Sequence, residues 1–169
     1  SGRFERLHQA QVQVMRAYGV KRIVLANQLL GRAHVESVAA MMREDPEFAF
    51  YCYVDSVPQL ENVARHLPAI PRPIHLLLEV GTTGGRTGVR TAEQAAAVAD
   101  AIAAADPARF RFAGVAMFEG VAPGLKESTQ PVADFARHVV EVARGLPASL
   151  YAGLDEFLLT GGGSSYFDI

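Results

Sequence analysis

The sequence has a single cysteine, Cys52, so no disulfide bond can form within the chain. Structural disulfides accumulate in oxidising compartments, and their absence favours a cytoplasmic location. The neighbours Tyr51, Tyr53 and Val54 indicate a buried, unreactive thiol rather than a nucleophile. We therefore expect a cytoplasmic protein that uses no cysteine chemistry.

Long apolar runs and runs of one charge are also missing. No stretch approaches the roughly 18 uncharged apolar residues that cross a membrane. The N-terminal SGRFERLHQAQ has no apolar segment of the kind found in signal peptides. The 16 basic and 18 acidic residues give a net charge of -2, and neither sign gathers into a run. The sequence therefore predicts neither a membrane nor a nucleic acid as partner, and a small molecule or a protein is expected.

Motifs for metal binding and for nucleophilic catalysis are absent. The 5 histidines are scattered without an HExxH pattern, and no GxSxG motif is present. Only two lysines occur: Lys21 precedes a predicted strand and Lys126 follows another. Both are interpreted as solvated side chains, although Lys126 could lie closer to the expected site.

The apolar residues predict one α/β domain that covers residues 1–169. Half of the residues are hydrophobic, which is enough for a sizeable core. Apolar runs predict strands at 22–27, 48–54, 74–80, 112–118 and 156–160. Apolar spacings of three and four predict helices at 5–18, 32–44, 57–67, 92–105 and 129–145. Because strands that are apolar throughout alternate with helices, the pattern predicts a parallel sheet.

Two parallel architectures fit this pattern, a doubly wound open sheet and a (β/α)8 TIM barrel. Both place site residues at the carboxyl ends of the strands. These ends are polar or rich in glycine, whereas no such polar clustering is expected at the strand starts. They comprise Asn27 and Gln28, Asp55 and Ser56, the loop 81–90, Glu119 and Gly120, and residues 161–165. A closed barrel usually takes about 250 residues, so a chain of 169 residues predicts either an open sheet or part of a barrel.

Residues 79–90 read EVGTTGGRTGVR, and so many glycines suggest a loop that binds a phosphate group. Glycine-rich loops between a strand and a helix often bind anions, but the spacing fits neither the dinucleotide fingerprint nor a Walker loop. Arg86 lies between glycines at a carboxyl strand end, where it is either solvated or directed inward. An inward Arg86 would meet an anion or a phenolate, and the glycines at 84, 85 and 88 would let the chain bend to direct it there.

The stretch TGGGSSYFD (160–168) is the stronger phosphate candidate. Three glycines in a row expose successive backbone N–H groups, and Ser164 and Ser165 add hydroxyl donors. A flexible turn is the alternative interpretation. Asp55 and Glu119 could orient a polar ligand, although Asp55 could instead cap the next helix and Glu119 could pair with an arginine.

Five motifs follow one another over nearly the whole chain and together resemble a known family. They are VLANQLLG (24–31), YCYVDS (51–56), LEVGTTGGRTGVR (78–90), FAGVAMFEG (112–120) and LLTGGGSSYFD (158–168). The sequence resembles the D-serine dehydratase and D-threonine aldolase family, which are fold type III pyridoxal phosphate enzymes. Their catalytic barrel is similar to the N-terminal domain of alanine racemase. The segment GGRTGVR resembles the D-serine deaminase branch more than the aldolases.

The resemblance implies roles for several residues. In the family, the arginine that follows the barrel strand matching residues 74–80 hydrogen-bonds the phenolic oxygen of pyridoxal 5'-phosphate. The matching residue in this sequence is Arg86. The glycine run would hold the phosphate group of the cofactor. The residues assigned to the cofactor in this way are Gly161, Gly162, Gly163 and Ser164, with Ser165 and Tyr166 as neighbours. Phe118 stands where many members carry a hydrogen-bonding tyrosine, and it joins Asp55 and Glu119 as a candidate pocket residue.

Two parts of the family pattern are not found in the chain. The family's Schiff-base lysine lies at the end of the first barrel strand, upstream of the motifs found here, and neither Lys21 nor Lys126 stands in that motif. The zinc or manganese ligands of many members lie in a C-terminal β-domain that the chain lacks. The sequence therefore resembles the middle of the barrel, roughly its third to seventh strands, with no catalytic residue and no metal ligand of its own.

The resemblance implies a pyridoxal phosphate-dependent lyase that acts on D-amino acids. A D-serine dehydratase, which eliminates to a 2-oxo acid and ammonia, is the first expectation. The alternatives are a retro-aldol enzyme for D-threonine-like substrates and a pyridoxal phosphate carrier without turnover. The full-length protein is expected to be a homodimer that binds a small-molecule D-amino acid. The polypeptide alone is expected to be inactive. A further alternative is that it binds no ligand by itself, because an incomplete barrel leaves strand edges unpaired.

Overall fold

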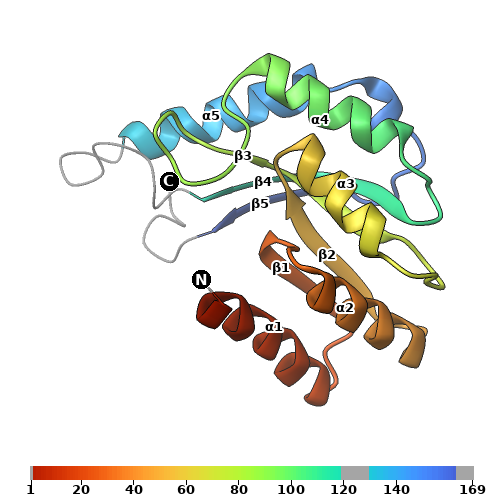
Figure 1. Cartoon of the computed structure of the whole chain (residues 1–169). Coiled ribbons are helices and arrows are strands. Elements are labelled where there is room, and N and C mark those ends of the chain that lie inside the picture. Colours follow the sequence, from red (N-terminus) through yellow and green to blue (C-terminus); the bar gives the residue numbers. More distant parts are fainter. Residues whose placement is uncertain (1, 119–129, 163–169) are drawn as a thin grey trace.

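The computed structural model describes residues 2–118 and 130–162 of the chain, in which helices and strands alternate (Figure 1). The elements are α1 (Gly2–Ala17), β1 (Arg22–Gln28), α2 (Arg32–Glu44), β2 (Ala49–Val54), α3 (Val57–His66), β3 (Ile74–Val80), α4 (Ala92–Ala104), β4 (Phe110–Phe118), α5 (Gln130–Gly145), the 3-10 turn η2 (Ala148–Leu150) and β5 (Leu158–Gly162). The predicted α/β succession is therefore confirmed in the described part of the chain.

The five strands form one parallel sheet in the order β1-β2-β3-β4-β5. Because neighbours in sequence are neighbours in the sheet, every crossover steps in the same direction, and right-handed crossovers then place the helices on one face. Figure 1 shows α2, α3, α4 and α5 along the outer side of a curled sheet. A doubly wound sheet would instead reverse its strand order at a switch point. The structure thus has the barrel architecture, present as a curled half-barrel.

The main core lies between the outer face of the sheet and the helices. Along β2, Phe50, Cys52 and Val54 belong to this core, whereas Tyr51 and Tyr53 belong to a second cluster on the inner face. This strand is buried on both faces, which explains why its sequence is apolar throughout. Burial raises the pKa of the Cys52 thiol to about 12, so the thiol stays protonated and unreactive, as its neighbours predicted.

Helix α4 shows how the sequence builds the outer layer. Ala95, Val98, Ala99 and Ile102 are buried and recur at the spacing of one helix face. The helix begins after Thr91, whose side chain accepts a hydrogen bond of 3.2 Å from the backbone nitrogen of Gln94 and so satisfies one free N–H group of the first turn. This start fixes the end of the 81–90 loop, where the candidate site lies.

Strand β5 is displaced by two residues from its predicted position. It runs from Leu158 to Gly162 and pairs with β4 from Gly114 to Phe118, so Gly161 and Gly162 are strand residues rather than the start of a loop. Backbone pairing with β4 sets where β5 ends. Backbone hydrogen bonds form whether or not the paired residues are apolar, so the strand continues into the glycines. Gly114 permits the close pairing: its φ is 147°, and a Cβ there would lie 1.9 Å from the carbonyl oxygen of Leu158.

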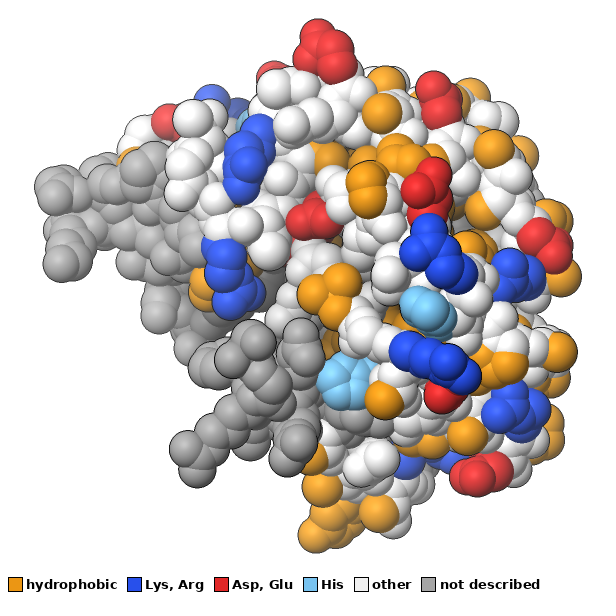
Figure 2. All heavy atoms as spheres, viewed as in Figure 1, with side chains coloured by type: hydrophobic (Ala, Val, Ile, Leu, Met, Phe, Trp, Pro, Cys, Tyr) orange, Lys and Arg blue, Asp and Glu red, His pale blue; other side chains and the backbone are white. Residues whose placement is uncertain are grey.

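The surface carries both signs of charge. Figure 2 shows basic and acidic side chains interspersed over the face that it presents, in keeping with the overall charge of -2. Among the described residues, no helix is both long enough and apolar enough to cross a membrane.

Candidate functional site

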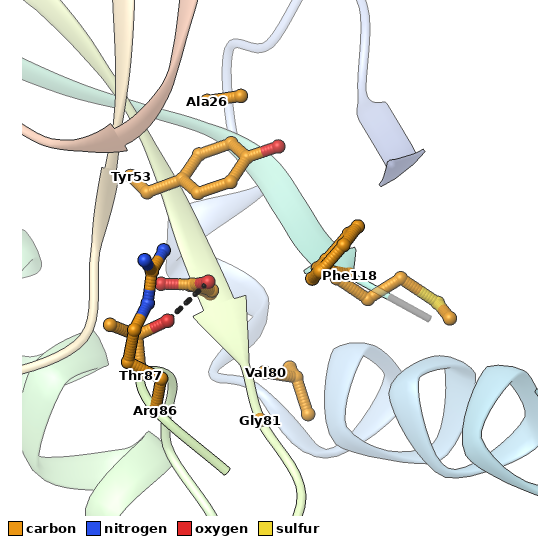
Figure 3. Close-up of a pocket in the computed structure, with 9 residues that line it drawn as sticks. Ala26, Tyr53, Val80, Gly81, Arg86, Thr87 and Phe118 are labelled. Atoms are coloured by element: carbon orange, nitrogen blue, oxygen red, sulfur yellow. Dashed lines mark hydrogen bonds between the residues drawn. The ribbon is translucent and has the colours of Figure 1, made fainter. Parts of the chain in front are cut away.

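A pocket of about 440 Å³ lies on the inner side of the sheet at the carboxyl ends of the strands. It is lined by Ala26, Tyr53, Glu79, Val80, Gly81, Arg86, Thr87, Met117 and Phe118, all of which are drawn in Figure 3. These residues come from four of the strands and from the loop after β3. The pocket therefore lies where parallel α/β proteins place their sites, as the polar strand ends predicted.

The loop after β3 is closed at its base by backbone contacts. The nitrogen of Gly81 donates to the carbonyl of Val89 at 2.9 Å, and the nitrogen of Val89 donates to the carbonyl of Glu79 at 2.8 Å. Between these bonds the chain reverses through Gly84 and Gly88, whose φ values are 77° and 90°. Such angles are costly for residues with a Cβ, so the glycines serve the bend.

Arg90 braces the outer side of the same loop. Its guanidinium donates to the carbonyl oxygen of Thr82 at 3.1 Å and to that of Gly85 at 2.5 Å. The two arginines of EVGTTGGRTGVR therefore have different surroundings: Arg90 is used within the loop, whereas the Arg86 side chain extends into the pocket toward Tyr53 (Figure 3). Within the described part of the chain, Arg86 forms no salt bridge or side-chain hydrogen bond. Its guanidinium is thus available to a ligand.

Glu79 is a buried acid in the wall of this pocket, with 7% of its surface exposed. It accepts hydrogen bonds from the hydroxyl of Thr87 at 2.9 Å and from the amide of Gln28. Burial raises the pKa of the Glu79 carboxyl, the two hydrogen bonds oppose the shift, and Asp55 adds to it by repulsion. The positive charge of Arg86 lowers this pKa, which places the guanidinium within electrostatic reach of Glu79.

The opposite walls of the pocket are largely apolar. Tyr53 is buried on the inner face of the sheet. Burial is the main cause that raises the pKa of the Tyr53 hydroxyl, so the ring is neutral. Met117 is buried and belongs to the main core, whereas Phe118 is 45% exposed and lines the pocket. Among the described residues, the site therefore combines the cation of Arg86 with flat apolar surfaces.

Asp55, a predicted pocket residue, lies beside this pocket rather than in its wall. It lines an adjoining pocket of about 390 Å³ near the starts of α3 and α4, which Arg86 also lines. Its carboxylate accepts hydrogen bonds from Gln28 at 3.0 Å and from the backbone nitrogen of Gly88 at 3.1 Å. These contacts, not a helix cap, are its described interactions.

The glycine run is described only at its start. Gly161 and Gly162 form the carboxyl end of β5, opposite Met117 and Phe118. A Cβ at Gly161 would lie 3.7 Å from the Cγ of Met117, which is an ordinary contact, so packing does not require glycine there. The other predicted site residues, Glu119, Gly163, Ser164, Ser165 and Tyr166, lie outside the described residues, as does Lys126.

The sequence patterns indicate no role for Tyr53, Glu79 and Thr87, and Gln28 stands out only as a polar residue at a strand end. One signal was present: Glu79 is an acid within the apolar run IHLLLEV. An acid at a buried strand position needs partners, and this position is the last inward-facing one before the loop.

The amino ends of the strands carry a second polar cluster, so the expectation that strand starts lack one is wrong. Arg22 forms a salt bridge with Glu156 and donates to the hydroxyl of Tyr51 at 3.2 Å. The Tyr51 ring stacks on His75 with 4.5 Å between centroids. Burial, followed by the charges of Arg111 and Arg22, lowers the pKa of His75. Strand alternation brings these inward-facing residues together, although their sequence neighbours are apolar.

A metal site is not found in the part of the chain that the structure describes, since no group of three or more His, Cys, Asp or Glu side chains is suitably placed there.

Comparisons with known proteins support the half-barrel fold described above. No curated protein matches the sequence. A crystal structure of D-threonine aldolase from Filomicrobium marinum matches with a TM-score of 0.69 and 22% sequence identity, over 92% of this chain and 41% of that one. At this identity the likeness shows the fold alone, and the chain spans less than half the length of that structure. The family model for the alanine racemase N-terminal domain matches residues 7–154, which is most of the chain, and the protein belongs to that family.

Proposed function

We propose that this chain forms the cofactor-binding part of a pyridoxal phosphate-dependent lyase that acts on D-amino acids. The observation that carries the proposal is the Arg86 side chain, which extends from a glycine-bent loop into the carboxyl-end pocket and forms no salt bridge or side-chain hydrogen bond with the described residues. Membership of the alanine racemase N-terminal domain family supports it. The favoured reaction is α,β-elimination from D-serine to a 2-oxo acid and ammonia.

The described residues fit pyridoxal 5'-phosphate in size and chemistry. A pocket of about 440 Å³ accommodates a small heteroaromatic ring, and Tyr53, Met117 and Phe118 offer apolar surfaces to its faces and edges. Arg86 offers a cation whose planar donors suit a phenolate oxygen. When bound, the cofactor supplies an electron sink that stabilises negative charge at the substrate's α-carbon.

The residues of this chain would bind and orient the cofactor. Arg86 would donate to the phenolic oxygen, and backbone N–H groups of Gly161, Gly162 and Gly163 with Ser164 would hold the phosphate. Ser165 and Tyr166 would lie beside the phosphate. Phe118 has no hydroxyl and would contribute only an apolar contact.

The proposal is tested in the complete protein, titrated with pyridoxal 5'-phosphate and supplied with D-serine. A saturable absorption change on cofactor addition, together with release of pyruvate and ammonia, is the expected result. If the complete protein binds no pyridoxal 5'-phosphate, the proposal is wrong. Binding without turnover of any D-amino acid would identify a carrier instead.

A retro-aldol reaction on D-threonine-like substrates is the second candidate, and the fold match to a D-threonine aldolase favours it. It breaks a carbon–carbon bond rather than a carbon–oxygen bond, so its products are glycine and an aldehyde. Supplying D-threonine and analysing the products separates the two reactions. A divalent metal (zinc or manganese) as a possible further cofactor and a homodimeric state are proposals from the family resemblance. A cytoplasmic location is a proposal from the single cysteine.

A further inference from the structure

Two carboxylates hold the loop immediately after Arg86. The hydroxyl of Thr87 donates to Glu79 at 2.9 Å, and the backbone nitrogen of Gly88 donates to Asp55 at 3.1 Å. Thr87 and Gly88 are the two residues that follow Arg86 in the chain. The two acids therefore fix the inner side of the loop at the point where the Arg86 side chain leaves it.

One amide joins these two acids. Nε2 of Gln28 donates to Oδ2 of Asp55 at 3.0 Å and also to Oε2 of Glu79. An amide NH₂ group has two hydrogens, so it can serve both acceptors at once. Two neighbouring carboxylates repel each other when both are charged, and a shared donor reduces that repulsion. Gln28 thus allows both acids to face the loop from adjacent strands.

The register of the sheet places Gln28 in this position. β1 pairs regularly with β2 up to Leu25, opposite Cys52, but the next paired residue is Gln28, opposite Tyr53. The irregularity moves the Gln28 amide to the level of Asp55 and Glu79. The network therefore links β1, the end of β2, β3 and the loop that carries Arg86.

We propose that Gln28 is a positioning residue for Arg86, acting through Asp55 and Glu79 on Thr87 and Gly88. The role in cofactor binding rests on the proposed function, whereas the effect on the loop does not. The loop has other restraints, the bridge between Val80 and Val89 and the bonds from Arg90. Those restraints hold its base and outer side, and the Gln28 network holds the inner side from which Arg86 projects.

The first test measures loop order without any ligand. In the complete protein, Gln28→Leu keeps the approximate shape and removes the amide, and amide hydrogen exchange is followed in peptides that cover residues 82–90. Loss of hydrogen bonds worth about 1 kcal/mol corresponds to roughly fivefold faster exchange. Gln13→Leu, at an exposed position of α1, is the matched control and should leave this exchange unchanged. Unchanged exchange in folded Gln28→Leu would overturn the proposal.

A second pair of variants covers the case in which Gln28→Leu does not fold. Thr87→Val removes the hydroxyl that donates to Glu79, while Thr87→Ser retains it. Faster exchange of 82–90 in the valine variant, restored by serine, supports the proposal. Equal exchange in the two variants counts against it, because the hydroxyl would then not hold the loop.

The last test asks whether Gln28 acts through Arg86. Pyridoxal 5'-phosphate affinity and the absorption spectrum of the bound cofactor are measured for Gln28→Leu, Arg86→Ala and the double variant. We expect both single variants to weaken binding and to shift the spectrum in the same direction, with no further loss of affinity in the double variant. Additive losses would overturn the link to Arg86. If the unmodified protein binds no cofactor, the proposed function fails while the exchange measurements still test the loop.

Discussion

The backbones of Gly81 and Gly88 pass so close that a Cβ on Gly88 would lie 2.4 Å from the backbone nitrogen of Gly81. A Cβ on Gly81 would in turn lie 2.1 Å from the carbonyl oxygen of Thr87. The contact closes the loop between β3 and α4 and fixes where Arg86 projects. Glycine is therefore needed in this loop both for the bend and for the close approach of the two backbone segments.

The loop offers a matched pair of glycine substitutions. Gly84 and Gly88 both have positive φ, but a Cβ at Gly84 would meet nothing within 4 Å. We expect Gly84→Ala to cost about 1–2 kcal/mol of the free energy of unfolding, from backbone strain alone. Gly88→Ala adds a clash with backbone and should cost clearly more. Urea unfolding measures both, and equal losses would show that the close approach does not matter.

Removal of the Arg86 side chain should weaken cofactor binding. A hydrogen bond that involves a charged group contributes about 1.5–3 kcal/mol, so Arg86→Ala should lower pyridoxal 5'-phosphate affinity by roughly 10- to 100-fold. Arg86→Lys retains the charge but not the planar donors and should recover only part of the loss. Arg65→Ala, at an exposed position of α3, is the control. Unchanged affinity in Arg86→Ala would remove this residue from the cofactor site.

Glu79 should make the protein less stable as pH rises. Burial raises the pKa of the Glu79 carboxyl, so the folded protein binds its proton more tightly than the unfolded chain does. This contribution to stability is complete below the ordinary carboxyl pKa and is lost as pH rises through the raised pKa. The unfolding free energy of the wild type relative to Glu79→Gln should therefore decrease as the pH rises above the ordinary carboxyl pKa. Urea unfolding at a series of pH values measures this difference in unfolding free energy, with Glu61→Gln at an exposed position as the control. A difference that does not change with pH would refute the assignment.

Asp45 should show the opposite pH dependence. Hydrogen bonds from Lys21, from the backbone of Glu47 and from Arg16 lower the pKa of the Asp45 carboxyl. The stability that it contributes is therefore present above the ordinary aspartate pKa and is lost as pH falls through the lowered value. The advantage of the wild type over Asp45→Asn should shrink on acidification. Thermal unfolding at a series of acidic pH values measures it, and an advantage that grows in acid would contradict the prediction.

The sequence by itself determined the succession of elements and the edge of the sheet that carries the candidate site. Hydrophobic periodicity located every described α-helix and strand to within a few residues, because burial on one or both faces dictates where apolar residues recur. The glycines around Arg86 predicted a bend, and the positive φ values of Gly84 and Gly88 confirm it. The roles of Arg86 and of the glycine run in cofactor binding stay predictions.

Only the tertiary structure decided which of the two parallel architectures the chain adopts and which side chains meet. The choice between an open sheet and a barrel depends on strand order, and local pattern carries no information on that order. The meeting of Gln28, Asp55 and Glu79 depends on the irregular register of β1 against β2, which is set by pairing between segments far apart in sequence. For the same reason the cluster of Arg22, Tyr51 and His75 at the strand starts was not foreseen: each residue is unremarkable in its own strand, and parallel pairing makes them neighbours.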